Sequence, residues 1–92
     1  MNLTPAQIEK IARRLAVTEE DEALLLSEGE FRGFGHSKSE TADRCMGYAD
    51  WIGYLPSCQR AAWISNGDPV WFDATSLDDA VEQVTSGAEL IN

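Results

Sequence analysis

The amino-acid sequence predicts a small single domain, residues 1–92, of the α+β class, with three or four helices packed on a short antiparallel sheet. A capped segment with apolar residues at helical spacing occurs at each end of the chain, and both predict helices. Between them, residues 61–74 form two β-rich runs separated by turn residues. This pattern predicts a C-terminal hairpin at the centre of the sheet.

The first helix has a complete set of start signals. Thr4 is placed as the N-cap, Pro5 takes the first helical position, and Gln7 completes a capping box. Apolar residues follow at the spacing of one helix face: Ile8, Ile11, Ala12 and Leu15. The chain's basic cluster lies off that face: Lys10, Arg13 and Arg14.

Thr18 is predicted to cap a second helix that ends at Gly29. Four acidic residues occupy its first turn, where the helix dipole favours negative charge: Glu19, Glu20, Asp21 and Glu22. A buried strand over residues 24–26 is the alternative, because a short apolar run does not distinguish strand from helix. We favour the helix.

Residues 31–36 have aromatic residues two apart with glycines between them, which indicates an extended or a looping segment, and an edge strand is one interpretation of it. Ser39 then offers an N-cap for a third helix ending near Gly53 and before Pro56. Its predicted apolar face repeats at helical spacing: Ala42, Cys45, Met46, Ala49 and Ile52.

The hairpin is predicted over residues 61–74, with its turn at residues 66–69, Asn-Gly-Asp-Pro. Ser76 is predicted to cap a final helix that ends at Gly87. The apolar face of this helix consists of Leu77, Ala80, Val81 and Val84.

Charge is the most informative property for function. The chain has 16 acidic and 7 basic residues, a net charge of −9, and no basic residue after Arg60. An acidic surface argues against direct binding of nucleic acid or of anionic membranes, because both gain affinity from Lys and Arg. We therefore expect a basic protein surface as the partner. The alternative is that the acidic excess only keeps the protein soluble.

The sequence contains no assembled catalytic or metal-binding motif. His36 is the only histidine, and it is interpreted as an exposed loop residue. Cys45 and Cys58 lack the paired spacing of structural zinc ligands. We therefore predict no catalytic residue, no metal and no cofactor. With neither a signal sequence nor an apolar run near the roughly 18 residues of a membrane span, a cytoplasmic location with reduced thiols is expected.

Aromatic residues supply candidate anchors for a partner. Tyr48 and Trp51 lie off the apolar face of the predicted third helix. Exposed Tyr and Trp are favoured at protein interfaces. We therefore predict that both contact the partner.

The segment Gly47-Tyr48-Ala49-Asp50-Trp51-Ile52 resembles a short stretch in the small acidic phage proteins that inhibit type I CRISPR surveillance complexes. The resemblance implies an inhibitor that acts in the bacterial host cell and occupies a nucleic-acid-binding groove. Some proteins of this kind place carboxylates where phosphates would lie.

Together these observations predict a non-enzymatic, acidic inhibitor or modulator of a nucleic-acid-handling complex. The predicted partner-binding residues are Glu19, Glu20, Asp21, Glu22, Glu28, Glu30, Tyr48, Asp50, Trp51, Asp78, Asp79 and Glu82. One alternative is a DNA-binding helix-turn-helix regulator built from the first two helices. Another is a small enzyme that uses His36 with Ser37 or Cys58.

Overall fold

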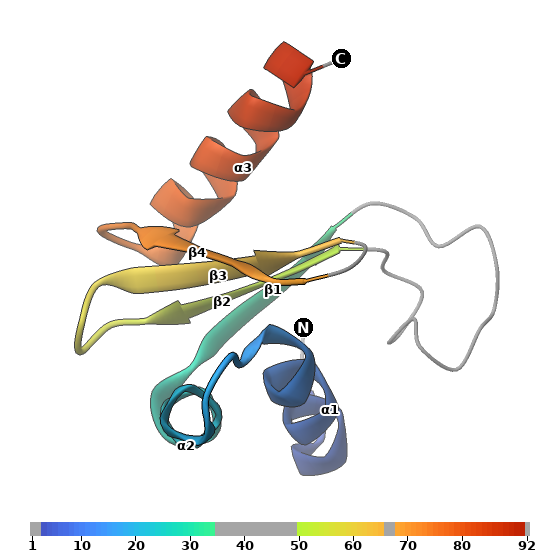
Figure 1. Ribbon diagram of the computed structural model, residues 1–92, viewed down its shortest axis with the longest axis vertical. Coiled ribbons are helices and arrows are strands. Elements are labelled where there is room, and N and C mark those ends of the chain that lie inside the picture. Colours follow the sequence, from blue (N-terminus) through green and yellow to red (C-terminus); the bar gives the residue numbers. More distant parts are fainter. Residues whose placement is uncertain (1–2, 35–49, 66–67, 92) are drawn as a thin grey trace, which may run out of the picture.

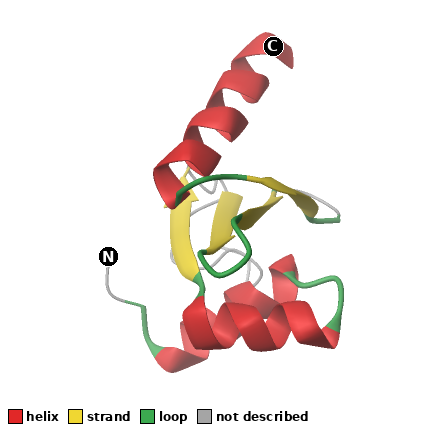
Figure 2. Ribbon diagram, turned by 90° about the vertical axis from the view of Figure 1, so that its left-hand side faces the viewer, coloured by secondary structure: helices red, strands yellow, loops and turns green. Residues whose placement is uncertain are grey.

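Four antiparallel strands in the order β1-β2-β3-β4 form the middle of the domain. The computed structural model describes residues 3–34, 50–65 and 68–91. Its elements are α1 (Pro5–Leu15), α2 (Glu19–Glu28), β1 (Glu30–Phe34), β2 (Asp50–Leu55), β3 (Arg60–Ile64), β4 (Val70–Asp73) and α3 (Leu77–Ile91). Helices α1 and α2 cover one face of the sheet and α3 packs on the other (Figures 1 and 2). The predicted α+β class is confirmed.

Helices α1 and α2 begin where the sequence predicted. Thr4 forms a capping box with Gln7, and Thr18 forms one with Asp21. Gly29 ends α2, and its backbone N–H donates to the Leu25 carbonyl at 3.0 Å. A Cβ at this position would collide with that carbonyl oxygen, so the close approach requires glycine.

The third predicted helix is wrong over residues 50–53, which belong to strand β2. Its predicted residues 39–49 lie outside the described part of the chain. The physical reason lies in residues 51–55, which are all buried although they are consecutive. A central strand covered on both faces has this uninterrupted burial, whereas a helix on a sheet buries one side only.

Strand β1 pairs with β2 and stands at the edge of the sheet, as predicted for this segment through Phe34. The hairpin is also confirmed, because Ala61 pairs with Phe72 and Trp63 with Val70. Residues 66–67 of its predicted turn lie outside the described residues.

The final helix starts as predicted, with the Ser76 hydroxyl accepting from the Asp79 N–H at 3.0 Å. Its predicted end is wrong, because α3 continues through Gly87 to Ile91. A single glycine costs a helix only about 1 kcal/mol relative to Ala, and no proline follows it here.

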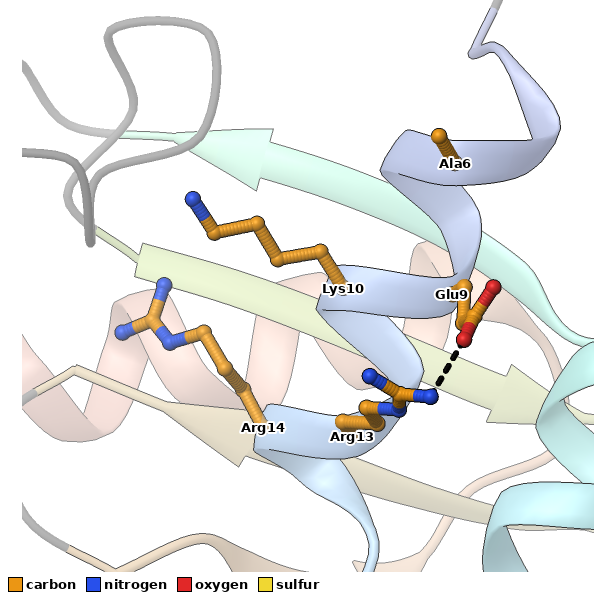
Figure 3. Close-up of a pocket in the computed structure, with 5 residues that line it drawn as sticks. All are labelled: Ala6, Glu9, Lys10, Arg13 and Arg14. Carbon is orange, nitrogen blue, oxygen red and sulfur yellow. Dashed lines mark ion pairs between the residues drawn. The ribbon is translucent and has the colours of Figure 1, made fainter.

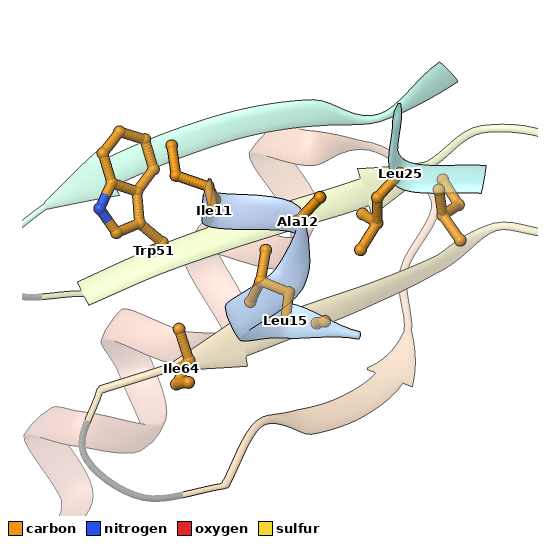
Figure 4. Packing of buried hydrophobic residues seen from close by; sticks show 8 residues of the cluster. Ile11, Ala12, Leu15, Leu25, Trp51 and Ile64 are labelled. Atoms are coloured by element: carbon orange, nitrogen blue, oxygen red, sulfur yellow. The ribbon is translucent and has the colours of Figure 1, made fainter. Parts of the chain in front are cut away.

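The sheet separates two apolar clusters, because successive side chains of a strand point to opposite faces. One cluster lies against α1 and α2 and contains Ile11, Ala12, Leu15, Leu25, Trp51, Leu55, Ala62 and Ile64 (Figure 4). The other lies against α3 and contains Ile52, Tyr54, Ala61, Ala74, Ala80 and Val84. Strand β2 contributes to both and is the centre of the domain.

Candidate functional site

The two aromatic residues predicted as anchors have different outcomes. Trp51 is 0% exposed and packs in the cluster under α1, so its prediction as a partner contact is wrong. On the predicted helix it would have lain off the apolar face, but on β2 it points into the core. Tyr48 lies outside the described residues.

Of the four acidic residues in the first turn of α2, two have a hydrogen bond or ion pair within the domain, and two have none among the described residues. The Asp21 carboxylate accepts from the N–H groups of Thr18 at 3.2 Å and Val17 at 3.3 Å, so it serves the helix start. Glu22 lies 3.5 Å from Arg13 Nε. Glu19 and Glu20 are exposed, and no hydrogen bond or ion pair holds them among the described residues.

Five carboxylates gather at one end of the sheet, which we call the acidic end: Glu28, Glu30, Asp73, Asp78 and Asp79. In an antiparallel sheet with strands in chain order, β1 and β3 start at the same end at which β2 and β4 finish. Helix α2 leads into β1 and α3 follows β4, so both helices also have a terminus at this end. Residues far apart in the sequence are thereby brought together.

Local contacts fix the positions of several groups at the acidic end. The Glu28 carboxylate accepts from the Ser57 N–H at 3.0 Å and from its hydroxyl, which ties α2 to the β2–β3 turn. The Ala74 N–H donates to the Gln59 carbonyl at 3.0 Å, which ties the end of β4 to the same turn. Asp73 and Asp79 line a shallow depression there together with Cys58 and Gln59.

The first turns of α3 contribute the other carboxylates. Asp78 is 89% exposed and lies 3.7 Å from Arg32, which is itself half exposed, so the pair is weak. Glu82 is exposed one turn further along the same helix. Asp50, also predicted as a partner contact, is half-buried and begins β2 at the opposite end of the sheet.

Tyr54 lies beneath this group of charges and is only 4% exposed. It pairs with Glu30 across β1 and β2. Burial raises the pKa of the Tyr54 hydroxyl above its usual value, and the negative charges of Glu30 and Asp79 raise it further. Carboxylates of β1 and α3 therefore act together on Tyr54, and Arg60, opposite Asp73, is a cation at the same end of the sheet.

Asp73 belongs to the acidic end but was not predicted as a contact residue. The signal that identifies it is the hairpin register, in which Asp73 pairs with Arg60 at the start of β3. The end of β4 therefore lies beside the β2–β3 turn. Among the described residues, no three His, Cys, Asp or Glu side chains are arranged to hold a metal ion.

Asp79 gives a prediction for the pH dependence of stability. Its carboxylate accepts from the Thr75 N–H at 3.0 Å and the Gln83 amide at 3.1 Å, and the bond from Thr75 is the main cause that lowers its pKa. Because this pKa is lower in the folded state than in the unfolded state, the ionised carboxylate stabilises the fold at pH values above the usual carboxyl pKa. This stabilisation disappears as the pH falls through the lowered pKa.

In urea unfolding at neutral pH, Asp79→Asn is therefore expected to be less stable than the wild type. The difference should disappear in acid, below the lowered pKa. Thr75 and Gln83 keep an acceptor in the variant, so the comparison isolates the charge. A difference that persists in acid would contradict this explanation.

The fold and the site define a small α+β domain with carboxylates concentrated at one end of its sheet. Comparison with protein-family models, curated proteins and solved structures finds no match to this chain. In the part of the chain that the structure describes, no helix has the length and apolarity to cross a membrane.

Proposed function

We propose that the protein inhibits or modulates a nucleic-acid-handling complex by placing its acidic end on a basic surface of that complex. The observation that supports this proposal is the gathering of Glu28, Glu30, Asp73, Asp78 and Asp79 from separate segments at one end of the sheet. A basic groove that binds phosphates offers complementary charge to such a surface. Following the resemblance, we propose a type I CRISPR surveillance complex as the target.

The acidic end is suited to binding because part of it is fixed and part is available. Glu28 and Asp79 are held by hydrogen bonds within the domain. Such preorganisation reduces the entropy that binding costs. The exposed side chains of Glu30 and Asp73 have no hydrogen bond or ion pair within the described residues. These two carboxylates are therefore available to Lys and Arg of a partner.

The helix-turn-helix alternative is less well supported. Residues 16–18 separate α1 from α2, as a short turn would. A recognition helix contacts base edges with Arg, Lys, Asn or Gln, and α2 contains none of these residues. The enzyme alternative depends on His36, which lies outside the described residues and remains a hypothesis.

The test uses a purified type I surveillance complex and its duplex DNA target. We expect the wild-type protein to reduce DNA binding by the complex. The double variant Glu30→Gln/Asp73→Asn should inhibit about twofold to thirtyfold less well, because an exposed ion pair contributes roughly 0.2–1 kcal/mol. Its inhibition should also depend less on salt.

The matched control is Glu19→Gln/Glu20→Gln, which removes two exposed charges from the other end of α2. We expect this control to inhibit nearly as well as the wild type. Equal losses in the two double variants would indicate a general effect of net charge and would contradict the proposed surface. A wild-type protein that leaves DNA binding unchanged would exclude this target.

A further inference from the structure

Strand β4 forms one edge of the sheet, and none of the described strands pairs with its outer side (Figure 1). In an antiparallel pair, alternate residues direct both of their backbone groups toward the neighbouring strand. The Ala74 N–H donates to the Gln59 carbonyl at 3.0 Å, so in the register of β3 and β4 the even-numbered residues of β4 face β3. Trp71 and Asp73 therefore direct their N–H and C=O groups away from the sheet.

A bond from α3 agrees with this direction at one end of the strand. The Gln83 side-chain amide donates to the Asp73 carbonyl at 3.0 Å, so that carbonyl is occupied. At the other end, Pro69 precedes β4 and has no N–H to donate. Among the described residues, the open part of the edge therefore consists of the N–H and C=O of Trp71 and the N–H of Asp73. Open backbone groups at a sheet edge are a template for an added strand.

On its α3 face, the edge presents apolar side chains. Val70 is 54% exposed, and Phe72 on the same face is half-buried against the α3 cluster. An added strand would place every second side chain beside these two residues. Apolar side chains at those positions would cover Val70, because cross-strand apolar pairs stabilise a sheet.

The open edge is flanked by carboxylates that have no partner within the domain. Asp68 lies before β4 and Asp73 ends it, and both are exposed without a hydrogen bond or ion pair on their side chains among the described residues. Arg60 lies opposite Asp73, but its guanidinium carbon is 5.3 Å from the centre of the Trp71 ring. Both carboxylates are therefore available to cations of a partner.

The basic cluster of α1 points away from the acidic end. Arg13 forms an ion pair with Glu9. The side chains of Lys10 and Arg14 extend toward the end of the sheet at which β2 begins (Figure 3). Asp73 ends β4 at the opposite end of the sheet. A cation beside Asp73 is thus not on the side to which these basic groups point.

We propose that β4 binds an extended segment of a partner protein as an added antiparallel strand. The segment residue opposite Trp71 exchanges both backbone hydrogen bonds with it. Apolar residues on either side of that position lie beside Val70 and Phe72, and Lys or Arg at the ends lies near Asp68 and Asp73. This inference goes beyond the proposed function and shares only Asp73 with the acidic end. Peptide titrations test it without a surveillance complex, so either proposal can fail alone.

The test titrates the ¹⁵N-labelled protein with the acetylated, amidated peptide Lys-Val-Thr-Val-Lys. Its threonine is designed to lie opposite Trp71 and its valines opposite Val70 and Phe72. We expect saturable shifts of the β4 amides and slower hydrogen exchange of the Trp71 and Asp73 amides. The peptide Val-Val-Thr-Lys-Lys has the same composition without the alternation. It should bind roughly tenfold more weakly, because it cannot place both valines on the α3 face.

A methyl group on the peptide backbone separates strand pairing from charge attraction. N-methylation of the threonine removes the N–H that donates to the Trp71 carbonyl, and the methyl group also keeps the strands apart. This peptide should bind roughly tenfold more weakly or worse. N-methylation of the second valine, whose N–H points to solvent, should leave the affinity nearly unchanged. Equal affinities of the two methylated peptides would overturn the proposal.

Substitutions in the protein test the flanking carboxylates. Asp68→Asn/Asp73→Asn should bind the peptide about twofold to thirtyfold more weakly, as expected for the loss of two exposed ion pairs. Glu19→Gln/Glu20→Gln is the matched control, with the same loss of charge on α2, and it should retain the affinity. Equal losses in the two variants would indicate attraction by net charge alone and would count against the proposed edge.

The other candidate for the edge is β4 of a second copy of this chain. Sedimentation and hydrogen exchange without peptide test this alternative at several protein concentrations. We expect a monomer in which the Trp71 and Asp73 amides exchange rapidly throughout. Protection of these amides that grows with protein concentration would overturn the proposal in favour of a dimer. A protein that does not bind Lys-Val-Thr-Val-Lys would also overturn it.

Discussion

Trp51→Ala is expected to lower the free energy of unfolding by about 3–5 kcal/mol, the usual cost of truncating a buried aromatic residue. Trp51 is 0% exposed on the central strand β2, in contact with the cluster formed by α1 (Figure 4). A domain of 92 residues has a total stability of roughly 5–14 kcal/mol, so this loss is a large part of it. Urea unfolding followed by circular dichroism measures the change.

The control for this prediction is Val70→Ala, which truncates an apolar residue that is 54% exposed at the sheet edge. Its effect should be within about 0.5 kcal/mol, as for other surface substitutions. The alternative role of Trp51 as a partner anchor makes the opposite prediction. A Trp51→Ala protein that keeps its stability but loses partner binding would restore that role.

Local sequence signals predicted the helix starts and the hairpin correctly. Thr4 with Gln7 and Thr18 with Asp21 form their capping boxes within four residues, so tertiary structure is not needed to recognise them. The turn chemistry at residues 66–69 is similarly local and indicates the hairpin without knowledge of the core.

Strand β2 was missed because its assignment depends on what covers it. Residues 51–55 are buried on both faces only because α1 and α2 lie below the sheet and α3 above it. Spacing within a short apolar run does not distinguish that environment from a helix. The error at β2 also explains the wrong placement of Trp51, since a helix and a strand direct the same residue to different surroundings.

The candidate site was predicted only in part, for a related reason. The sequence shows which regions are rich in carboxylates, but the strand order determines which of them meet. Glu30 and Asp79 are far apart in the chain, yet both influence the hydroxyl of Tyr54. Asp50 and Glu19, which looked equivalent to them in the sequence, lie elsewhere. Charge composition thus indicated the kind of surface, and topology determined its location.

Gly53→Val is the second substitution expected to have a large effect, because three elements meet over this glycine. A Cβ at Gly53 would lie 2.8 Å from Leu15 Cδ1, 2.9 Å from Leu25 Cδ2 and 3.3 Å from Phe31 Cε1. These side chains belong to α1, α2 and β1, so all three would have to move. Overpacking of this kind costs about 1–3 kcal/mol, and occasionally more.

Local propensity alone predicts that Gly53→Val stabilises the protein, because valine favours strands and glycine weakens them. We expect the opposite change in stability. Gly53→Ala, which adds a single carbon, should be less destabilising than Gly53→Val. The side chains packed over β2 leave no room for a side chain at position 53. We therefore expect the cost of overpacking to exceed the gain in strand propensity. Urea unfolding of the two variants measures their free energies of unfolding. A Gly53→Val protein as stable as the wild type would contradict the prediction.

A double variant tests whether the collision with Leu15 is the cause. Leu15→Ala alone should cost about 2–5 kcal/mol because it leaves a cavity in the α1 cluster. In combination, the valine at position 53 can occupy part of that cavity, so the two losses should sum to more than the measured loss. Residues in contact typically show interaction energies of about 0.5–3 kcal/mol in such a cycle. Strictly additive losses would mean that Gly53 is required for another reason, and that the close approach of α1 to β2 does not determine the choice of residue.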